Sequence, residues 1–225
     1  MKKLIKIIAL ALAAMLILCS CNNGTFTTST KETKPAGAAD GFGYDMNGDV
    51  QTDDESLSEE HQKVKFTMEK GGSFVIELYP EYAPKTVENF VDLVSEGFYD
   101  GLTFHRIVDD FMAQGGDPMG TGMGGSSKKI KGEFSINGYT KNTLSHTRGV
   151  VSMARLSNSY NSASSQFFIC YGDATFLDGQ YAAFGQVIEG MEVVDSFLEV
   201  ERTMDNDGDI SKPVEPIVIE MAEVL

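Results

Sequence analysis

The stretch that decides the fold is LTFHRIVDDFMAQGGD, residues 102–117. Two runs rich in apolar residues, Phe104–Val108 and Met112–Gly116, flank a segment of three residues, Asp-Asp-Phe. This pattern is typical of a β-hairpin with a short loop. A three-residue loop fixes the register of the two strands and places Arg106 directly opposite Gln114.

Alternation along a strand determines which side chains of this hairpin share a face. Opposed residues on paired strands share a face, and so do alternate residues of one strand. We therefore expect Arg106, Met112 and Gln114 to project together, with Phe111 at the mouth. A guanidinium, an amide and an apolar wall can hold an apolar ring and present one strong donor to an amide. From these residues alone, a hairpin with an exposed arginine is an equal alternative.

The remainder of the chain from His61 onward predicts a mainly β fold. A helix is predicted over Pro84–Gly97, with apolar residues at helical spacing, Pro in the first turn and Gly at the stop. A second helix is predicted over Met191–Val200. Besides the hairpin, strands are predicted at residues 64–68, 73–79, 149–154, 166–171, 182–188 and 216–224. About eight strands and two helices favour a closed eight-stranded antiparallel β-barrel capped by two α-helices.

Two further patterns imitate ligand motifs without the context that such motifs need. The segment Pro118–His146 contains a formal GxGxxG but lacks the strand and helix of a dinucleotide site, so we interpret it as a flexible surface loop beside a groove. Two acidic turns resemble the start of a calcium loop but lack its closing residues, and we interpret both as solvated: Asp45, Asn47, Asp49 and Asp205, Asp207, Asp209. His61 and His146 are isolated, so no metal site is expected.

The N-terminal residues predict export and lipidation. A basic start and an apolar run of about a dozen residues fit a signal peptide, whereas a membrane span needs ~20. The run ends in Leu-Cys-Ser-Cys, which resembles a bacterial lipobox with Cys21 as the lipidated residue. We expect a signal peptide over residues 1–20 and a protein outside the cytoplasm, lipid-anchored to the bacterial cell membrane. The alternatives are an uncleaved apolar N-terminus or ordinary secretion.

The segment that follows Cys21 predicts a tether. From residue 22 to 60 there are nine acidic residues and two lysines, with few apolar anchors, which indicates a disordered acidic tether over residues 21–60. The folded domain is expected over residues 61–225, where Cys170 would be a buried small hydrophobe. The formal net charge of −15 for all 225 residues argues against nucleic acid as a partner.

Several long motifs of the domain occur together and in order. They are YPEYAPKTVENFVDL at 79–93, YDGLTFHRIVDDFMAQGGDPMGTG at 99–122, GVVSMAR at 149–155, SQFFICYG at 165–172 and LDGQYAAFGQVIEGMEVVD at 177–195. On these motifs the chain resembles the cyclophilin-type peptidyl-prolyl cis-trans isomerases. The resemblance runs from about residue 61 to the end and implies a cyclophilin-like barrel.

The resemblance also implies a set of site residues. Arg106 corresponds to the catalytic arginine and Gln114 to the amide that orients the substrate carbonyl. The seat for the proline ring corresponds to Phe111, Met112, Phe168 and Leu177, and the groove for the substrate backbone to Ala154, Arg155 and Gln166. Strand alternation independently puts Gln166 and Phe168 on one face, and Phe167 and Ile169 on the other, in the core.

Two positions depart from many eukaryotic members. Phe176 stands where they have Trp, and Tyr181 where they have His. Both should still belong to the substrate-binding set, because Tyr181 can close the pocket and donate through its hydroxyl. The missing indole N–H predicts weak cyclosporin binding.

Alternation turns His105 away from Arg106, so we interpret His105 as structural or at the groove edge.

The leading functional hypothesis is a peptidyl-prolyl isomerase that assists folding of exported proteins. It needs no cofactor, binds proline-containing polypeptides, reaches the membrane through lipid at Cys21 and is expected to be a monomer. One alternative is a proline-peptide-binding holdase whose catalysis is incidental. A calcium-dependent adhesin that uses the acidic tract is the less favoured third class.

Overall fold

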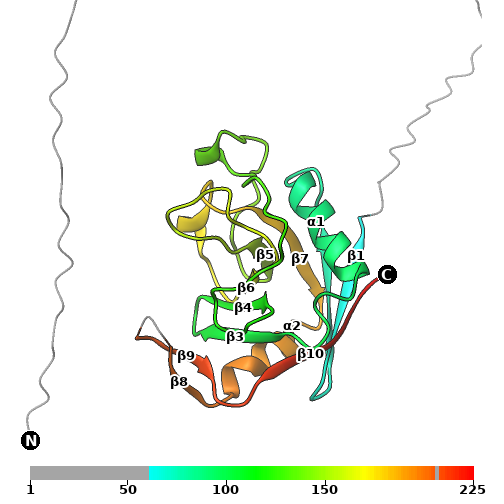
Figure 1. Ribbon diagram of the computed structural model, residues 1–225, viewed down its shortest axis with the longest axis vertical. Helices are drawn as coiled ribbons and strands as arrows, with labels where there is room; N and C mark the ends of the chain where they lie inside the picture. The colour runs from blue at the N-terminus through cyan, green and yellow to red at the C-terminus, as the bar shows by residue number, and fades with distance from the viewer. Residues whose placement is uncertain (1–60, 206–207) are drawn as a thin grey trace, which may run out of the picture. The chain divides into compact units, whose positions relative to one another are not determined.

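Ten strands and a few short helices make up the part of the chain that the computed structural model describes, residues 61–205 and 208–225 (Figure 1). Eight strands close a barrel in the order β1-β10-β3-β4-β6-β5-β7-β2, and every neighbouring pair is antiparallel. Their bounds are Lys63–Met68 (β1), Ser73–Leu78 (β2), Thr103–Val108 (β3), Met112–Asp117 (β4), Val150–Met153 (β5), Phe167–Cys170 (β6), Ala183–Glu189 (β7) and Ile217–Val224 (β10). The closed eight-stranded barrel expected from the sequence is confirmed.

Helix α1 (Pro84–Ser95) confirms the first predicted helix and ends two residues earlier. The second prediction is only half right. Helix α2 covers Met191–Asp195, and a 3₁₀ helix, η3 (Ser196–Glu199), continues it. A 3₁₀ turn commonly finishes an α-helix, and sequence periodicity does not separate the two forms over so few residues.

Aromatic rings fill the barrel interior. The rings with no exposed surface belong to Phe66, Phe74, Phe90, Tyr99, Phe104, Phe167 and Phe184. Phe66 and Phe74 lie opposite each other on β1 and β2, with ring centroids 5.1 Å apart. Such burial contributes about 1.5–3 kcal/mol for each large side chain. The interior is therefore packed solid, and a substrate site has to lie on the outside of the wall.

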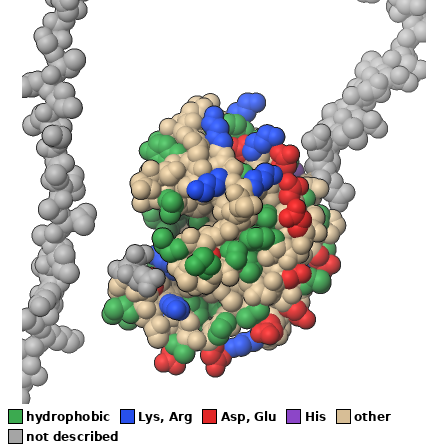
Figure 2. Space-filling model, in the orientation of Figure 1, with side chains coloured by type: hydrophobic (Ala, Val, Ile, Leu, Met, Phe, Trp, Pro, Cys, Tyr) green, Lys and Arg blue, Asp and Glu red, His purple; other side chains and the backbone are tan. Residues whose placement is uncertain are grey.

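The segment between β4 and β5 is only partly the surface loop that the sequence predicted. It forms a 3₁₀ turn, η1 (Ser135–Asn137), and buries Ile130, Glu133 and Phe134. Its exposed residues include Lys128, Lys129, Lys131 and Lys141. Lys and Arg side chains gather at this end of the molecule in Figure 2, while acidic side chains line one edge. The negative charge of the protein is thus unevenly spread over this face.

A small hairpin that the sequence analysis did not predict lies outside the barrel. Strands β8 (Arg202–Met204) and β9 (Ile210–Pro213) pair with each other, and β9 packs against β3 (Figure 1). These strands are short and flanked by acidic residues and Gly, without the alternation that marks a longer strand. The hairpin matters because β3 carries Arg106.

No helix among the described residues has the length and apolar content needed to cross a membrane. The predictions of a signal peptide at 1–20, a lipidated Cys21, a tether at 21–60 and an acidic turn at Asp45 lie outside the described residues.

Candidate active site

The β3–β4 hairpin has the register that its three-residue loop predicts. Arg106 pairs with Gln114, and Val108 pairs with Met112. Asp110 closes the loop with a φ of 58°, in the left-handed region that Asp tolerates better than most residues. The Phe111 carbonyl then accepts a hydrogen bond of 2.9 Å from the backbone N–H of Tyr171, which ties the loop to the end of β6.

A small cavity on the outer face of the barrel collects most of the predicted site residues. It has a volume of about 140 Å³ and is lined by Arg106, Phe111, Met112, Gln114, Ala154, Arg155, Phe168, Leu177 and Tyr181. Small-molecule sites usually measure ~300–1,000 Å³, so this cavity suits a single side chain rather than a whole ligand. Its apolar floor packs on buried Cys170, whose pKa burial raises to about 12, which confirms the small hydrophobe expected there.

Strand alternation on β6 is also confirmed. Phe167 and Ile169 belong to the barrel core, whereas Phe168 belongs to the small cluster under the cavity. The 3₁₀ turn η2 (Thr175–Leu177) brings Leu177 against that cluster from a distant part of the chain. Residues from β3, β4, β6 and η2 therefore converge on one spot.

The two substituted positions, Phe176 and Tyr181, lie differently. Tyr181 lines the cavity and packs edge-on against Phe168, with ring centroids 6.0 Å apart. Phe176 does not line it. Its side chain is 64% exposed and its ring lies 5.7 Å from the Phe111 ring, so it forms part of the rim. The Arg155 guanidinium carbon sits 4.4 Å from the Tyr181 ring centroid and backs that ring.

Gln166 lies next to the cavity rather than in its wall. Its Oε1 accepts a 2.8 Å hydrogen bond from Gln114 Nε2, and its own Nε2 donates to the carbonyls of Gly122 and Gly124. Gln166 therefore fixes the orientation of Gln114 and ties β6 to the loop after β4. A second N–H of Gln114 remains for a substrate carbonyl, since an amide nitrogen has two.

The glycines of the formal GxGxxG motif shape this loop. Gly120 and Gly122 have φ values of 62° and 80°, and a Cβ on Gly125 would collide with the Ser164 hydroxyl. The loop lines a second cavity of about 300 Å³ together with residues 154–156 and Gln166. The motif thus builds a groove wall, in agreement with the sequence interpretation, and has no helix behind it.

Asp117 at the end of β4 organises the same loop. Its carboxylate accepts hydrogen bonds from the backbone N–H groups of Met119, Thr121, Gly122 and Gly124, at 2.6–3.2 Å. Burial alone would raise the pKa of this carboxyl, but the four donors outweigh it and the pKa is lowered. A Cβ on Gly124 would collide with the carboxylate, so glycine is required there.

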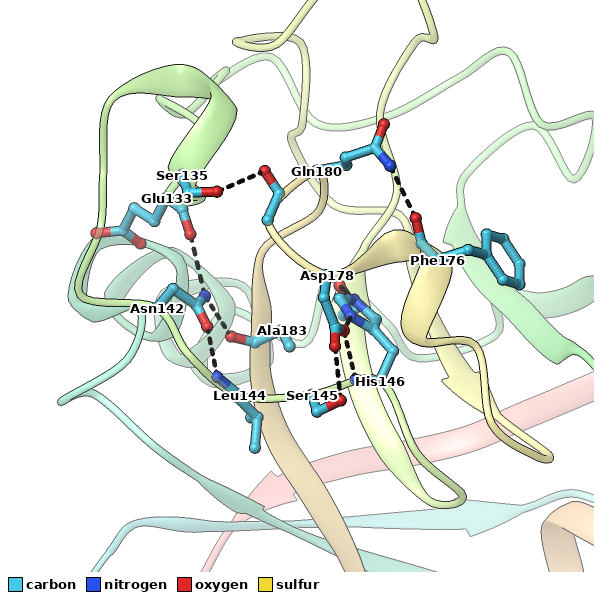
Figure 3. Close-up of polar contacts among 12 residues, drawn as sticks. Glu133, Ser135, Asn142, Leu144, Ser145, His146, Phe176, Asp178, Gln180 and Ala183 are labelled. Atoms are coloured by element: carbon cyan, nitrogen blue, oxygen red, sulfur yellow. Dashed lines mark hydrogen bonds and ion pairs between the residues drawn. The ribbon is translucent and has the colours of Figure 1, made fainter.

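A polar network behind the cavity holds η2 in place (Figure 3). Asp178 accepts hydrogen bonds from the Ser145 hydroxyl (2.6 Å) and from the backbone N–H and ring Nδ1 of His146 (both 2.8 Å). Burial lowers the pKa of His146, against the opposing effect of Asp178, so the ring is neutral at pH 7 and its Nε2 accepts from the Ser152 hydroxyl, 2.9 Å away. The ring stacks on Phe168 and so supports the cavity floor.

The expectation that alternation turns His105 away from Arg106 is wrong, whereas its expected place at the groove edge is confirmed. A β-bulge between Phe104 and Arg106 breaks the strict alternation, and His105 and Arg106 line the same third cavity, of about 590 Å³. Burial lowers the pKa of His105, against the opposing charge of Asp117. A bulge adds one residue to one strand, which hydrophobic patterning does not reveal.

The third cavity also contains residues that the sequence analysis missed as neighbours of the site. Thr121, Met204, Asp205 and Lys212 line it, and the last three come from the β8–β9 segment. The solvated turn expected around Asp205 is wrong for that residue, whose side chain is only 14% exposed and lies 3.6 Å from Arg106 Nε. The signal was present in the spacing of the acidic residues, but nothing local indicates that they face Arg106.

Comparison with known proteins agrees with this geometry. Residues 63–224 match the family model of cyclophilin-type peptidyl-prolyl cis-trans isomerases. The chain is 43% identical over 155 residues to peptidyl-prolyl cis-trans isomerase ppi1 of Schizosaccharomyces pombe, covering 68% of this chain and 94% of that relative. It is 44% identical over 149 residues to peptidyl-prolyl cis-trans isomerase B of Bacillus subtilis, covering 66% and 94%.

A solved structure is similar along most of its length. The cyclophilin-type isomerase of Cryptosporidium parvum, crystallised in the presence of the dipeptide Ala-Pro, superposes with a TM-score of 0.62 at 33% identity, covering 73% of this chain and 99% of that one. The family match and the placement of Arg106 beside an apolar cavity on a closed barrel lead to one conclusion: the chain belongs to the cyclophilin-type peptidyl-prolyl cis-trans isomerases.

Proposed function

We propose that this protein accelerates rotation about X–Pro bonds in exported polypeptides, outside the cytoplasm, while anchored to the membrane by lipid on Cys21. The observation that carries the catalytic part is the position of Arg106 in the wall of the small cavity, beside Phe111, Met112 and Phe168. The similar isomerase crystallised with Ala-Pro supports a proline-containing peptide as the ligand.

The reaction determines what the site has to do. Amide resonance gives the X–Pro bond a rotational barrier of ~18–20 kcal/mol, and rotation takes tens to hundreds of seconds. At the transition state the amide is twisted and the nitrogen lone pair is no longer delocalised. A donor aimed at that lone pair binds the twisted form and not the planar one, which is the differential binding that catalysis requires.

Arg106 has the properties for this task. A guanidinium is always charged and holds several N–H donors in a fixed plane. No proton is transferred, so the reaction needs neither a nucleophile nor a general base. The proline ring would sit on Met112, Phe168 and Leu177, while Gln114, fixed by Gln166, would donate to the substrate carbonyl.

The required rate limits what Arg106 alone can supply. Shortening the reaction from about a minute to about a millisecond is roughly five decades, or ~7 kcal/mol. One preorganised donor typically contributes about 3–4 kcal/mol. Desolvation of the ring and orientation of the carbonyl must contribute the rest, so activity should not vanish when Arg106 is removed.

We expect Arg106→Ala to lower kcat/KM for a short X–Pro peptide by about two to three decades and to leave a residual rate. Arg148→Ala is the matched control, because Arg148 pairs with Asp195 and lines none of the three cavities. The control should retain the wild-type rate. An unchanged rate in Arg106→Ala would remove Arg106 from the mechanism.

A second candidate function rests on the apolar residues around the groove. Met123, Leu156, Phe176 and Met204 are each at least 50% exposed, and they lie in or beside the walls of the three cavities. Exposed apolar surface of this kind can retain unfolded chains. Refolding of a proline-limited client separates the candidates: a holdase keeps its effect in Arg106→Ala, whereas an isomerase loses most of it.

The location is tested at Cys21. Metabolic labelling with a radioactive fatty acid should mark the wild-type protein, and Cys21→Ser should remove the label and shift the protein from the membrane to the soluble fraction. Two acyl chains are enough for stable anchoring, because each buried CH₂ contributes ~0.8 kcal/mol. An unlabelled wild-type protein would contradict the anchor and leave the catalytic proposal standing.

A further inference from the structure

Two carboxylates of the β8–β9 hairpin face the side chain proposed to act on the substrate. Asp205 Oδ2 lies 3.6 Å from Arg106 Nε, and Asp209 Oδ2 lies 3.8 Å from an Arg106 terminal nitrogen, Nη2. The two carboxylates therefore face the edge of the guanidinium that Nε and Nη2 form.

Arg106 stands between two cavities of different character. It lines both the small apolar cavity and the larger polar one that also contains Asp205. Its Nε is buried and has no hydrogen-bond partner within the described ranges. At 3.6 and 3.8 Å, both distances exceed the length of a hydrogen bond, so these two contacts restrain the guanidinium by charge.

The hairpin itself fixes the Asp205 carboxylate. Oδ2 accepts a 2.5 Å hydrogen bond from the Ser211 hydroxyl, and Oδ1 accepts one of 2.9 Å from the Asp209 backbone N–H. Arg202 then fastens the hairpin to the hairpin that carries Arg106, by donating to the Asp109 carboxylate at 2.7 Å and to the Ile107 carbonyl at 3.4 Å. Hydrogen bonds from Ser211 and Asp209 therefore fix the Asp205 carboxylate beside Arg106.

From this arrangement we infer that Asp205 is a positioning residue for Arg106, with Asp209 as a weaker second charge. Asp205 does not touch the substrate. It restrains the orientation of the guanidinium so that Arg106 can donate to the proline nitrogen, which matters because a small misplacement of a catalytic group costs rate. The inference rests on the proposed role of Arg106.

The sharpest test is a double-mutant cycle in the peptide isomerisation assay. In the wild-type background, Asp205→Asn should lower kcat about three- to fivefold with KM nearly unchanged, as expected for a partly exposed ion pair that acts at the transition state. In the Arg106→Ala background, the same change should alter the residual rate less than twofold, because its effect passes through Arg106.

Three further variants separate positioning from general stability. Asp209→Asn should cost less than twofold, because its carboxylate is 65% exposed. Ser211→Ala should reproduce part of the Asp205 effect, and it replaces Asp205→Asn in the cycle if that variant does not fold. Asp92 lies on α1, and Asp92→Asn breaks its exposed ion pair with Lys128 and should leave kcat unchanged.

Each outcome has a definite meaning. Equal losses in both backgrounds would show a structural role and overturn the inference. A rise in kcat on Asp205→Asn would show that the aspartates hold Arg106 away from the substrate, and it would also overturn the inference. A wild-type rate no faster than the uncatalysed one would instead overturn the proposed function, and the positioning role with it.

Discussion

At Asp117 a single carboxylate determines the shape of one groove wall. Four backbone N–H groups of the following loop donate to this carboxylate, and Asp117 is only 1% exposed. Without this acceptor, several buried donors of the loop would lose their partner. An unsatisfied buried donor costs about 1–3 kcal/mol.

We expect Asp117→Asn to lower the free energy of unfolding at pH 7 by about 2–3 kcal/mol and to raise KM, because the loop lines two cavities. The pKa of Asp117 is lowered in the folded state. Its stabilisation is therefore present above the unfolded pKa of ~3.9 and is lost as the pH falls through the lower folded value.

Urea unfolding at pH 7 and pH 3 measures this effect. The difference between wild type and Asp117→Asn should be large at pH 7 and should shrink at pH 3, where the carboxyl of the unfolded wild-type chain takes up a proton. A difference that stays the same at both pH values would contradict an ionised acceptor.

Some site residues were predictable one by one from the sequence, and others were not. The facing of Arg106 and Gln114 follows from the length of a local loop, so the sequence was sufficient. Phe168 and Leu177 reach the cavity from more than 50 residues away, and the sequence placed them there only through the family resemblance. The bulge at His105 and the carboxylate of Asp205 depend on tertiary contacts that no local pattern encodes.

Helix α1 shows the same limit at the scale of an element. Pro84 and the apolar spacing predicted where it begins, but the residue at its N-cap, Ala83, forms no side-chain cap. The acceptor comes from Glu133, whose buried carboxylate receives the backbone N–H groups of Lys85 (3.0 Å) and Thr86 (2.8 Å) and the Thr86 hydroxyl. A distant residue thus completes a local element.

We expect Glu133→Ala to lower the free energy of unfolding by about 2–3 kcal/mol, because a helix cap and a buried acceptor are lost together. Glu133→Gln keeps an acceptor and should cost about 1 kcal/mol. The matched control is Glu88→Gln, which breaks an exposed ion pair with Lys85 and should change stability by less than ~0.5 kcal/mol. Equal effects of Glu133→Ala and the control in urea unfolding would contradict the capping role.

The molecule as a whole separates packing from function. The barrel interior is filled with aromatic rings, and closure removes exposed strand edges that invite aggregation. The candidate site lies on the outside of the wall, where β3, β4 and β6 supply outward-facing side chains and later loops cover them. Fold class was predictable because it depends on alternation and strand number. The covering loops depend on single hydrogen bonds, such as those of Asp117 and Asp178, which alternation does not reveal.

Stability of the whole domain should depend on pH through two histidines. Burial lowers the pKa of His146, although Asp178 opposes the shift, and burial also lowers the pKa of His105, although the charge of Asp117 opposes it. Both rings are neutral in the folded protein at pH 7. Below the unfolded pKa of ~6.5, the unfolded chain binds protons that the folded protein does not, so stability falls as the pH falls.

We therefore expect the free energy of unfolding to decrease between pH 7.5 and 5.5, by up to ~1.4 kcal/mol per pH unit for each histidine in the steepest range. Urea unfolding at three pH values measures the slope, and His105→Gln should reduce it, because one of the two titrating groups is gone. This window lies above the one below pH 4 in which Asp117 and Asp178 take up protons, since the pKa values of both carboxyls are lowered. A stability that is flat from pH 7.5 to 5.5 would contradict the lowered pKa values of the two histidines. The interpretation of His146 as a neutral ring that supports the floor of the small cavity would then be wrong.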